Sequence, residues 1–254
     1  MLFAPAEFEA LNRRDLSETV CVVFDVLRAT STMVTALANG ATAIVPVAEI
    51  SEALSLKQRR PEVLLAGERD GLRIQADLTG GVAFDLGNSP REFTVEAVRG
   101  RTIVMTTTNG TRALRACAQA RKVVAGSFLN LQATADFIER EDPDHLLLVC
   151  SGTHEEAAGE DVLGAGALCD LIWSRFSTGA VADSAHMARR LFQVEAGDLL
   201  AALSRTRNGR RLMGLTELRE DVAFCARQNV HRLVAEMGKD GIVRQKGVPG
   251  GTPF

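Results

Sequence analysis

The sequence predicts one α/β domain over residues 1–254, with three α/β/α layers around a mostly parallel or mixed sheet. Short apolar runs alternate with helix-like segments through the first two-thirds of the chain. The run at 145–150 (HLLLVC) is almost continuously apolar, which is typical of a strand buried on both faces of a parallel sheet. After residue 152 the pattern becomes helical and predicts a helical excursion over about residues 155–228. The pattern leaves the strand order open.

Local signals place the individual elements along the chain. Gly40 and Pro61 are expected to end the first two helices, because glycine favours helix ends and proline cannot continue a helix. Strands are expected at 19–25, 42–47, 62–66, 101–105, 122–125, 145–150, 232–236 and 242–245. Helices are expected from the Thr/Ser cluster after residue 25 to residue 39, and at 51–60, 94–99, 111–118, 131–140, 161–176, 184–192, 197–205 and 216–227. The Gly- and Asp-rich stretch 71–90 is expected to be a loop or a hairpin, and residues 247–254 to be poorly ordered.

Composition excludes several classes of protein. The chain is 46% hydrophobic and 24% charged, close to the averages for globular proteins. Its formal net charge of −3, the single Trp173 and the absence of a basic tract argue against a nucleic-acid partner. No apolar run approaches the roughly 20 residues that span a bilayer, so no membrane partner is expected.

The cysteines and the first residues predict a cytoplasmic protein. Five cysteines are widely spaced, without a CxxC pair, and most lie in apolar runs. They are therefore expected to be buried small hydrophobic residues in a reducing compartment. Residues 1–15 contain acidic side chains and no signal-like apolar core.

The first strand leads into a run with the composition of an anion site, Asp25-Val26-Leu27-Arg28-Ala29-Thr30-Ser31-Thr32. In open α/β sheets, ligands bind at the carboxyl ends of strands. The hydroxyls of Thr30 and Ser31 can cap the next helix, whose N–H groups and dipole attract anions. Arg28 adds a charge-assisted donor. Plain helix capping beside a surface arginine is the alternative.

Two further strand ends carry polar residues. Glu68 lies between Gly67 and Gly71 and offers the hard oxygen ligand that Mg²⁺ prefers, although a solvated turn is the alternative. Asn88 and Ser89, in the run FDLGNSP, offer side chains or nearby amides to a ligand. Asn, Ser and Pro are also ordinary turn formers, so this second run is ambiguous by itself.

The run TTTNGTRAL at 106–114 is the strongest candidate for an oxyanion cradle. Thr108, Asn109 and Thr111 surround Gly110, and Arg112 lies in the first turn of the predicted helix. A structural turn needs fewer hydroxyl and amide donors than this run contains. The run is not a P-loop, because the pattern GxxxxGK[ST] is absent.

A fifth region follows the strand at 145–150. Glu160 and Asp161 open a helix, where acids are favoured by the helix dipole in any case. The alternative is that one of them completes a metal site with Asp25 or Glu68. His154 is either a proton donor or a surface residue.

Taken in order, these runs resemble the 2-phosphosulfolactate phosphatase family. The resemblance rests on DVLRATST, GERDG, FDLGNSP and TTTNGTRAL, and on the later GEDVLGAGAL, RNGRRL and EDVAFCA. It covers about residues 20–229 and is specific, since TTTNGTRAL and DLGNSP are not generic turn sequences. Two departures are slight: Ser31 stands where a threonine is expected, and residues 72–77 replace a shorter glycine-rich form.

The resemblance implies an α/β, Mg²⁺-dependent phosphomonoesterase that converts 2-phospho-3-sulfolactate to 3-sulfolactate and phosphate. In methanogens this step belongs to coenzyme M biosynthesis, and a homodimer is common for such enzymes. We expect Asp25, Glu68 and Asp161 to hold Mg²⁺, directly or through waters, while the metal and Arg28 neutralise the phosphate. Phosphate or sulfonate oxygens are expected to bind Thr30, Ser31, Asn109, Gly110 and Thr111, and Arg112 to bind the substrate bidentately.

The nucleophile and the function class have alternatives. A metal-bound water is the expected nucleophile, and a phosphoenzyme through Asp25 is the rival. Against the rival, Val26 and Leu27 follow Asp25, so the second acid of haloacid-dehalogenase-type phosphatases is missing. Other possible functions are a phosphatase of another small organic acid or sugar phosphate, a non-catalytic anion-binding module, and a structural domain.

Overall fold

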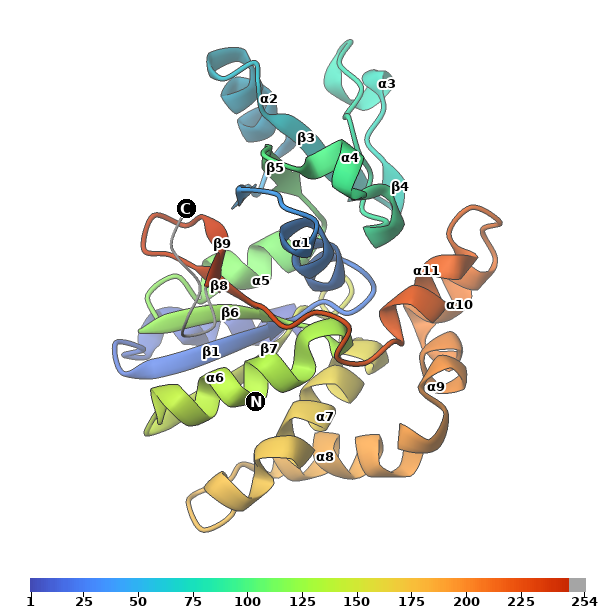
Figure 1. The fold of residues 1–254 in the computed structure, drawn as a ribbon. Helices are drawn as coiled ribbons and strands as arrows, with labels where there is room; N and C mark the ends of the chain where they lie inside the picture. Colours follow the sequence, from blue (N-terminus) through green and yellow to red (C-terminus); the bar gives the residue numbers. More distant parts are fainter. Residues whose placement is uncertain (247–254) are drawn as a thin grey trace.

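The computed structural model describes residues 1–246 and has a nine-stranded mixed sheet between two layers of helices (Figure 1). The predicted α/β/α architecture with its helical excursion is therefore confirmed. The prediction of poor order at 247–254 concerns residues outside the described part of the chain.

Nine strands of the described chain pair into this sheet. They are β1 (Thr19–Phe24), β2 (Ala43–Pro46), β3 (Leu64–Arg69), β4 (Leu72–Arg73), β5 (Thr102–Thr106), β6 (Lys122–Gly126), β7 (His145–Cys150), β8 (Val234–Met237) and β9 (Val243–Lys246). Their order is β4-β3-β5-β2-β9-β8-β6-β1-β7. All eight predicted strands are present, with ends shifted by at most three residues, and β4 forms a hairpin with β3 inside the stretch 71–90.

The sheet contains two parallel groups that are joined by an antiparallel hairpin. β1 is parallel to β6 and β7, and β5 is parallel to β2 and β3. Between the groups, β6–β8, β8–β9 and β9–β2 are antiparallel, so the groups run in opposite directions. A sheet twists by roughly 20–25° per strand, so the five steps from β5 to β1 turn the strand direction by roughly 100–125°. Figure 1 shows β3 and β5 at a steep angle to β1 and β6, and the twist lets the carboxyl ends of both groups converge.

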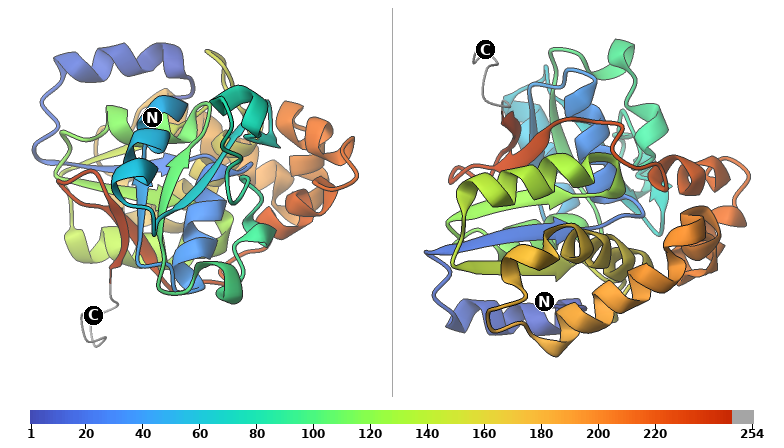
Figure 2. Two further views of the ribbon diagram at one scale, coloured as in Figure 1. Left: turned by 90° about the horizontal axis from the view of Figure 1, so that it is seen from above. Right: turned by 60° about the horizontal axis from the view of Figure 1, so that its bottom comes forward.

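Helices cover both faces of the sheet. One face carries α1 (Ala29–Ala38), α5 (Gly110–Ala116) and the 3₁₀ helix η1 (Pro5–Arg13), which packs on α5 (Figure 2). The other carries α2 (Ile50–Arg59), α6 (Leu131–Glu141) and α7 (Gly159–Phe176). The short helices α3 (Ala76–Thr79), α4 (Val95–Val98), η2 (Pro90–Glu92) and η3 (Phe128–Asn130) lie in connections.

The alternating side chains of β1 explain the two cores. Cys21 and Val23 point to the face of α1 and α5, while Val22 and Phe24 point to the face of α6 and α7. All four side chains are fully buried. A strand whose two sides both contact helices must be apolar throughout, as the sequence pattern of this strand indicates.

The helical excursion continues from α7 along one side of the molecule (Figure 1). It consists of α8 (Asp183–Glu195), η4 (Ala196–Asp198), α9 (Leu199–Arg205), α10 (Arg207–Met213) and α11 (Arg219–Cys225). Helix α10 is not among the predicted elements. Its charged sequence RNGRRL buries only Gly209 and Leu212, which is too little for an apolar period to be visible.

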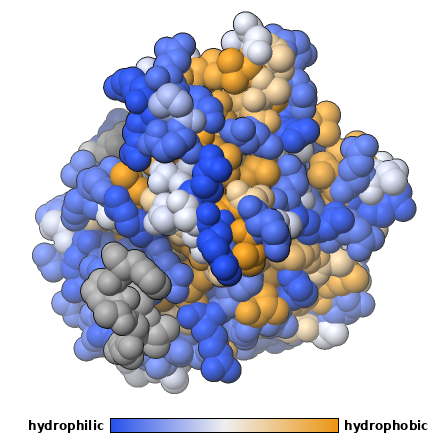
Figure 3. Space-filling model, turned by 45° about the horizontal axis from the view of Figure 1, so that its top comes forward, coloured by the Kyte–Doolittle hydropathy of each residue, from blue (hydrophilic) through white to orange (hydrophobic). Residues whose placement is uncertain are grey.

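The surface of the described chain is mixed in polarity. Figure 3 shows hydrophilic residues over most of one face, with hydrophobic residues in separate patches. Within residues 1–246, none of the helices combines the length and the apolar character that crossing a membrane requires.

Candidate active site

A small cavity of about 90 Å³ opens where the carboxyl ends of the strands meet the helical excursion. Asp25 follows β1, Glu68 lies in β3, Thr108 follows β5 and Gly152 follows β7. Helix α10 closes the cavity with Asn208, Arg211 and Leu212. Segments far apart in the sequence therefore share one site at the place where α/β sheets usually bind ligands.

Asp25 is held firmly in the cavity wall. The side chain is only 9% exposed, and its Oδ1 accepts a hydrogen bond of 2.9 Å from the Ala29 amide at the start of α1. The Thr30 hydroxyl donates to the Asp25 carbonyl at 2.9 Å. A Cβ at Gly110 would lie 2.5 Å from the Asp25 Oδ2, so only glycine allows α5 to approach this carboxylate so closely.

Asp25 has an unusual affinity for protons. Burial raises the pKa of Asp25 from 3.8 to about 6, against the lowering effect of the hydrogen bond from the Ala29 amide. The negative charges of Glu68 and Glu160 raise this pKa further. A carboxyl group that titrates near neutrality in a cavity is typical of a functional site.

Glu68 connects two strand ends. Its Oε1 accepts hydrogen bonds from the Thr108 amide at 2.8 Å and the Thr108 hydroxyl at 2.9 Å, and its Oε2 accepts one from the Gly71 amide at 2.7 Å. A Cβ at Gly67 would lie 2.1 Å from the Thr106 carbonyl oxygen, so glycine lets β3 pass β5 just before Glu68. Glu68 is 8% exposed and lines the cavity beside Asp25.

Asp161, the third expected metal ligand, serves the backbone instead. Its Oδ1 accepts from the Val26 amide at 2.8 Å, and its Oδ2 accepts from the Ser151 hydroxyl and the Gly152 amide, both at 3.0 Å. Burial raises the pKa of Asp161 well above its usual value. Asp161 is not among the cavity-lining residues. In the described chain, no three His, Cys, Asp or Glu side chains are grouped so as to hold a metal, so the expected three-carboxylate group is not formed.

Three of the expected phosphate-binding hydroxyls turn away from the cavity. Thr30, Ser31 and Thr111 are fully buried and lie outside its lining. The Ser31 hydroxyl donates to the Val26 carbonyl at 2.8 Å, and the Thr111 hydroxyl donates to the Thr107 carbonyl at 3.2 Å. Hydroxyls near helix starts commonly satisfy local backbone groups in this way, which is the physical reason for the difference.

Thr108 and Asn109 do line the cavity, but part of their hydrogen-bonding capacity is used internally. The Thr108 hydroxyl donates to Glu68, and the Asn109 Nδ2 donates to the carbonyls of Ser151 and His154, both at 3.1 Å. The run after β5 thus joins the ends of β3 and β7. Gly110 contributes the close approach to Asp25 described above and is not part of the lining.

The two arginines expected to be catalytic have different environments. Arg28 is 3% exposed and lines the cavity. The side chain of Arg112 is 47% exposed, pairs with Glu155 at 2.5 Å and lies outside the cavity lining. The buried positions of α5 include Gly110, Thr111, Ala113 and Leu114, so the position between them faces outward. The structure therefore does not place Arg112 as a substrate clamp.

Asn88 and Ser89 lie at the edge of this site. Asn88 lines the cavity, and its carbonyl oxygen accepts a hydrogen bond of 2.8 Å from the Thr32 hydroxyl. Ser89 lies in the wall of an adjoining cavity, where its hydroxyl donates to Asp221 at 2.6 Å.

Sequence reasoning did not select the residues that α10 and α11 contribute. Asn208 and Arg211 from α10 line the cavity, and Asp221 from α11 pairs with Arg28 at 2.6 Å. The runs RNGRRL and EDVAFCA, which carry part of the family resemblance, were the available signal. They indicated family membership without indicating which side chain faces a ligand.

Comparisons with known proteins agree on one family. The model of the family described as 2-phosphosulpholactate phosphatase matches residues 7–240. A relative from Caldanaerobacter subterraneus subsp. tengcongensis is 37% identical, over 93% of this chain and 95% of its own. One from Caldicellulosiruptor saccharolyticus is 40% identical, over 87% and 90%. One from Thermotoga maritima is 37% identical, over 84% and 86%. Each of these three is named "Probable 2-phosphosulfolactate phosphatase".

Proposed function

The chain belongs to the 2-phosphosulfolactate phosphatase family, and from this premise we propose that it is a Mg²⁺-dependent phosphomonoesterase that hydrolyses 2-phospho-3-sulfolactate to 3-sulfolactate and phosphate. The observation that carries the proposal is the pair of buried carboxylates, Asp25 and Glu68, which face one cavity together with Arg28 and Arg211.

The charges of this cavity support a requirement for a cation. Asp25, Glu68 and Asp70 line it together with Arg28 and Arg211, and Arg211 lies beside Asp70. A phosphate dianion beside several carboxylates is repelled unless a cation lies between them. Mg²⁺ prefers hard oxygen ligands and is usually held by one or two carboxylates, waters and the phosphate of the substrate. Asp25 and Glu68 fit this set, and the ion would neutralise charge on the phosphoryl group when bound.

The remaining residues bind and orient. Arg28 and Arg211 can donate hydrogen bonds to phosphoryl oxygens as charge develops on them in the transition state. Glu68 holds the turn after β5 through Thr108 and thereby fixes the shape of the wall. The hydrogen bond from the Ala29 amide to Asp25 keeps that carboxylate directed along the cavity wall before substrate arrives.

The test is phosphate release from racemic phosphosulfolactate, with and without Mg²⁺, beside phospholactate and an aryl phosphate. Mg²⁺-dependent release that favours phosphosulfolactate is the expected result. Release only from the other esters would retain phosphatase chemistry and discard this substrate. No release from any ester would leave an anion-binding module as the better description.

Hydrolysis by direct attack of water is proposed over a phosphoenzyme on Asp25. Against a phosphoenzyme, Val26 and Leu27 follow Asp25, so the second acid of haloacid-dehalogenase-type phosphatases is missing. Trapping with a phosphate mimic followed by mass spectrometry of the peptide that contains Asp25 tests this proposal. A covalent adduct on Asp25 would replace the direct mechanism by the two-step mechanism.

A further inference from the structure

A second and larger cavity adjoins the proposed phosphate site. It has a volume of about 520 Å³, within the usual range of roughly 300–1,000 Å³ for small-molecule sites. Arg28, Gly71 and Asn88 line both cavities, so they form the boundary between them. The outer wall comes from β4, η2 and the segment before α11.

The two cavities differ in their balance of charge. Three carboxylates and two arginines line the first cavity, whereas three arginines, Arg28, Arg73 and Arg91, and two glutamates, Glu92 and Glu217, line the second. The first cavity therefore needs a cation before it can accept an anion. In the second, Asp221 pairs with Arg28 and Arg91 from behind the wall, so three guanidinium groups face three carboxylates and an oxyanion meets no net repulsion.

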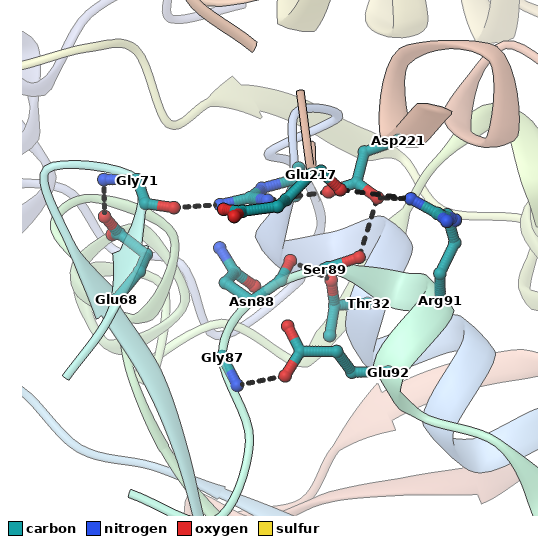
Figure 4. Close-up of polar contacts among 11 residues, drawn as sticks. Thr32, Glu68, Gly71, Gly87, Asn88, Ser89, Arg91, Glu92, Glu217 and Asp221 are labelled. Atoms are coloured by element: carbon teal, nitrogen blue, oxygen red, sulfur yellow. Dashed lines mark hydrogen bonds and ion pairs between the residues drawn. The ribbon is translucent and has the colours of Figure 1, made fainter. Parts of the chain in front are cut away.

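A buried network fixes the guanidinium at the boundary. Arg28 Nη1 donates to Asp221 Oδ2 at 2.6 Å, and the two side chains are 3% and 0% exposed. Figure 4 shows Asp221 also reached by Ser89 and Arg91, at 2.6 and 3.6 Å. Arg28 Nη2 donates to the Gly71 carbonyl at 2.5 Å. Asp221 thus anchors helix α11 to the loop after β1 and sets the orientation of Arg28.

The boundary also has hydrogen-bonding capacity that the protein does not use. A guanidinium carries five N–H donors, and within residues 1–246 Asp221 and Gly71 account for two of those on Arg28. Asn88 is 5% exposed, and its Oδ1 has no hydrogen-bond partner in the described chain. A rotation that exchanges the oxygen and nitrogen of this side-chain amide would point its two N–H donors at the cavity instead. Buried polar groups without partners are costly, so their presence at a cavity wall indicates a polar ligand there.

We propose that Arg28 and Asn88 bind the second acidic group of the substrate, so that its phosphate occupies the first cavity and its sulfonate or carboxylate the second. Asp221 is a positioning residue that acts by orienting Arg28. This inference rests on the proposed phosphatase function and assigns the substrate class as small phosphate esters with a further oxyanion. Such esters are distinguished from simple phosphomonoesters at this boundary.

The test compares three esters in two variants and a control. Asn88→Asp puts a negative charge where the oxyanion would bind, and Asp221→Asn releases Arg28. Both should lower kcat/KM for phosphosulfolactate more than for an aryl phosphate, by a further factor of about 10–100, as expected for hydrogen bonds to charged groups. Phospholactate has the carboxylate and lacks the sulfonate. If its kcat/KM falls as much as that of phosphosulfolactate, the carboxylate is the bound group; if it falls only as much as that of the aryl phosphate, the sulfonate is. Asp170→Asn, which disrupts an arginine pair away from both cavities, should leave the ratio unchanged.

Equal losses for all esters in both variants would overturn the assignment. Thermal melting identifies an Asp221→Asn chain that has failed to fold, and Asn88→Asp then decides. If no ester is hydrolysed, the phosphatase proposal fails, and calorimetry still tests the boundary with EDTA-treated protein. Binding of 3-sulfolactate more tightly than malate assigns the sulfonate, and the reverse order assigns the carboxylate. Binding of neither ligand, or equal binding by wild type and Asn88→Asp, overturns the inference.

Discussion

Asp25→Asn removes a charge that the fold buries at the expense of stability. The pKa of Asp25 is raised from 3.8 to about 6, chiefly by burial. A carboxyl whose pKa is higher in the folded chain favours folding while it is protonated, and this contribution is lost as pH rises from the unfolded pKa through the folded one. About two pKa units at about 1.4 kcal/mol each correspond to about 3 kcal/mol. Asparagine keeps the shape and the Oδ1 acceptor without the charge, so the metal-free variant should be the more stable protein.

Urea unfolding of EDTA-treated protein across pH measures this difference. By linkage, the advantage of Asp25→Asn should grow from about 1 kcal/mol near about pH 4.5 to about 3 kcal/mol near about pH 7.5. Phosphate release should be abolished in the same variant. Mg²⁺ should raise the melting temperature of wild type more than that of Asp25→Asn, because the variant keeps only Glu68 of the two proposed carboxylate ligands.

Asp15→Asn is a control for which the expected change in stability has the opposite sign to that of Asp25→Asn. Asp15 is exposed, and hydrogen bonds from Ser17 lower its pKa, so its contribution to stability is present above the unfolded pKa and lost at lower pH. The free energy of unfolding of Asp15→Asn should therefore be lower than that of wild type at neutral pH. A pH-independent difference for Asp25→Asn, or a destabilised Asp25→Asn at about pH 7.5, would refute the buried-charge reasoning.

Three further substitutions test other parts of the site. Gly110→Ala places a Cβ 2.5 Å from the Asp25 carboxylate and should cost about 1–3 kcal/mol of stability and most of the turnover. Gly197→Ala is the control, because open space surrounds Gly197, and it should change neither quantity. Thermal melts measure the stability, and phosphate release measures the turnover. Arg112→Lys should leave KM within about twofold, because exposed ion pairs contribute only about 0–1 kcal/mol; a tenfold rise in steady-state KM would return Arg112 to the site. Asp161→Ala should cost about 1–3 kcal/mol for each backbone amide it leaves unpaired, measured by urea unfolding at acidic pH, where Asp161 is protonated and no buried charge is removed; wild-type stability there would contradict the clamp.

Local patterns predicted most elements, because β1, β7 and α6 carry strong and continuous signals. What the sequence could not indicate was the pairing of distant segments. The hairpin of β8 and β9 lies between β2 and β6, and Ile44 pairs with Val243. No local periodicity encodes a contact across that separation.

The residues of the candidate site likewise divide into those that the sequence could indicate and those that it could not. Asp25, Glu68 and Asn109 could be selected because each follows or ends a strand, where ligands gather. The hydroxyls of Thr30 and Thr111 were selected for the same reason, but the backbone uses them. Asp221 could not be selected, since its importance arises from a partner 193 positions away. Residue type and position relative to a strand predict candidates, while the direction of each side chain depends on tertiary packing.

The position of the β8–β9 hairpin has a consequence for synthesis. Residues 43–106 can form the group around β5, and residues 19–150 can supply the group around β1. The two groups are joined only through the β8–β9 hairpin between β2 and β6, and this hairpin cannot form until residues 234–246 have emerged. A nascent chain that has passed residue 150 thus carries two half-sheets, each with an unpaired inner edge. Unpaired edges invite pairing with other chains, so this chain is most exposed to aggregation between the translation of β7 and that of β9.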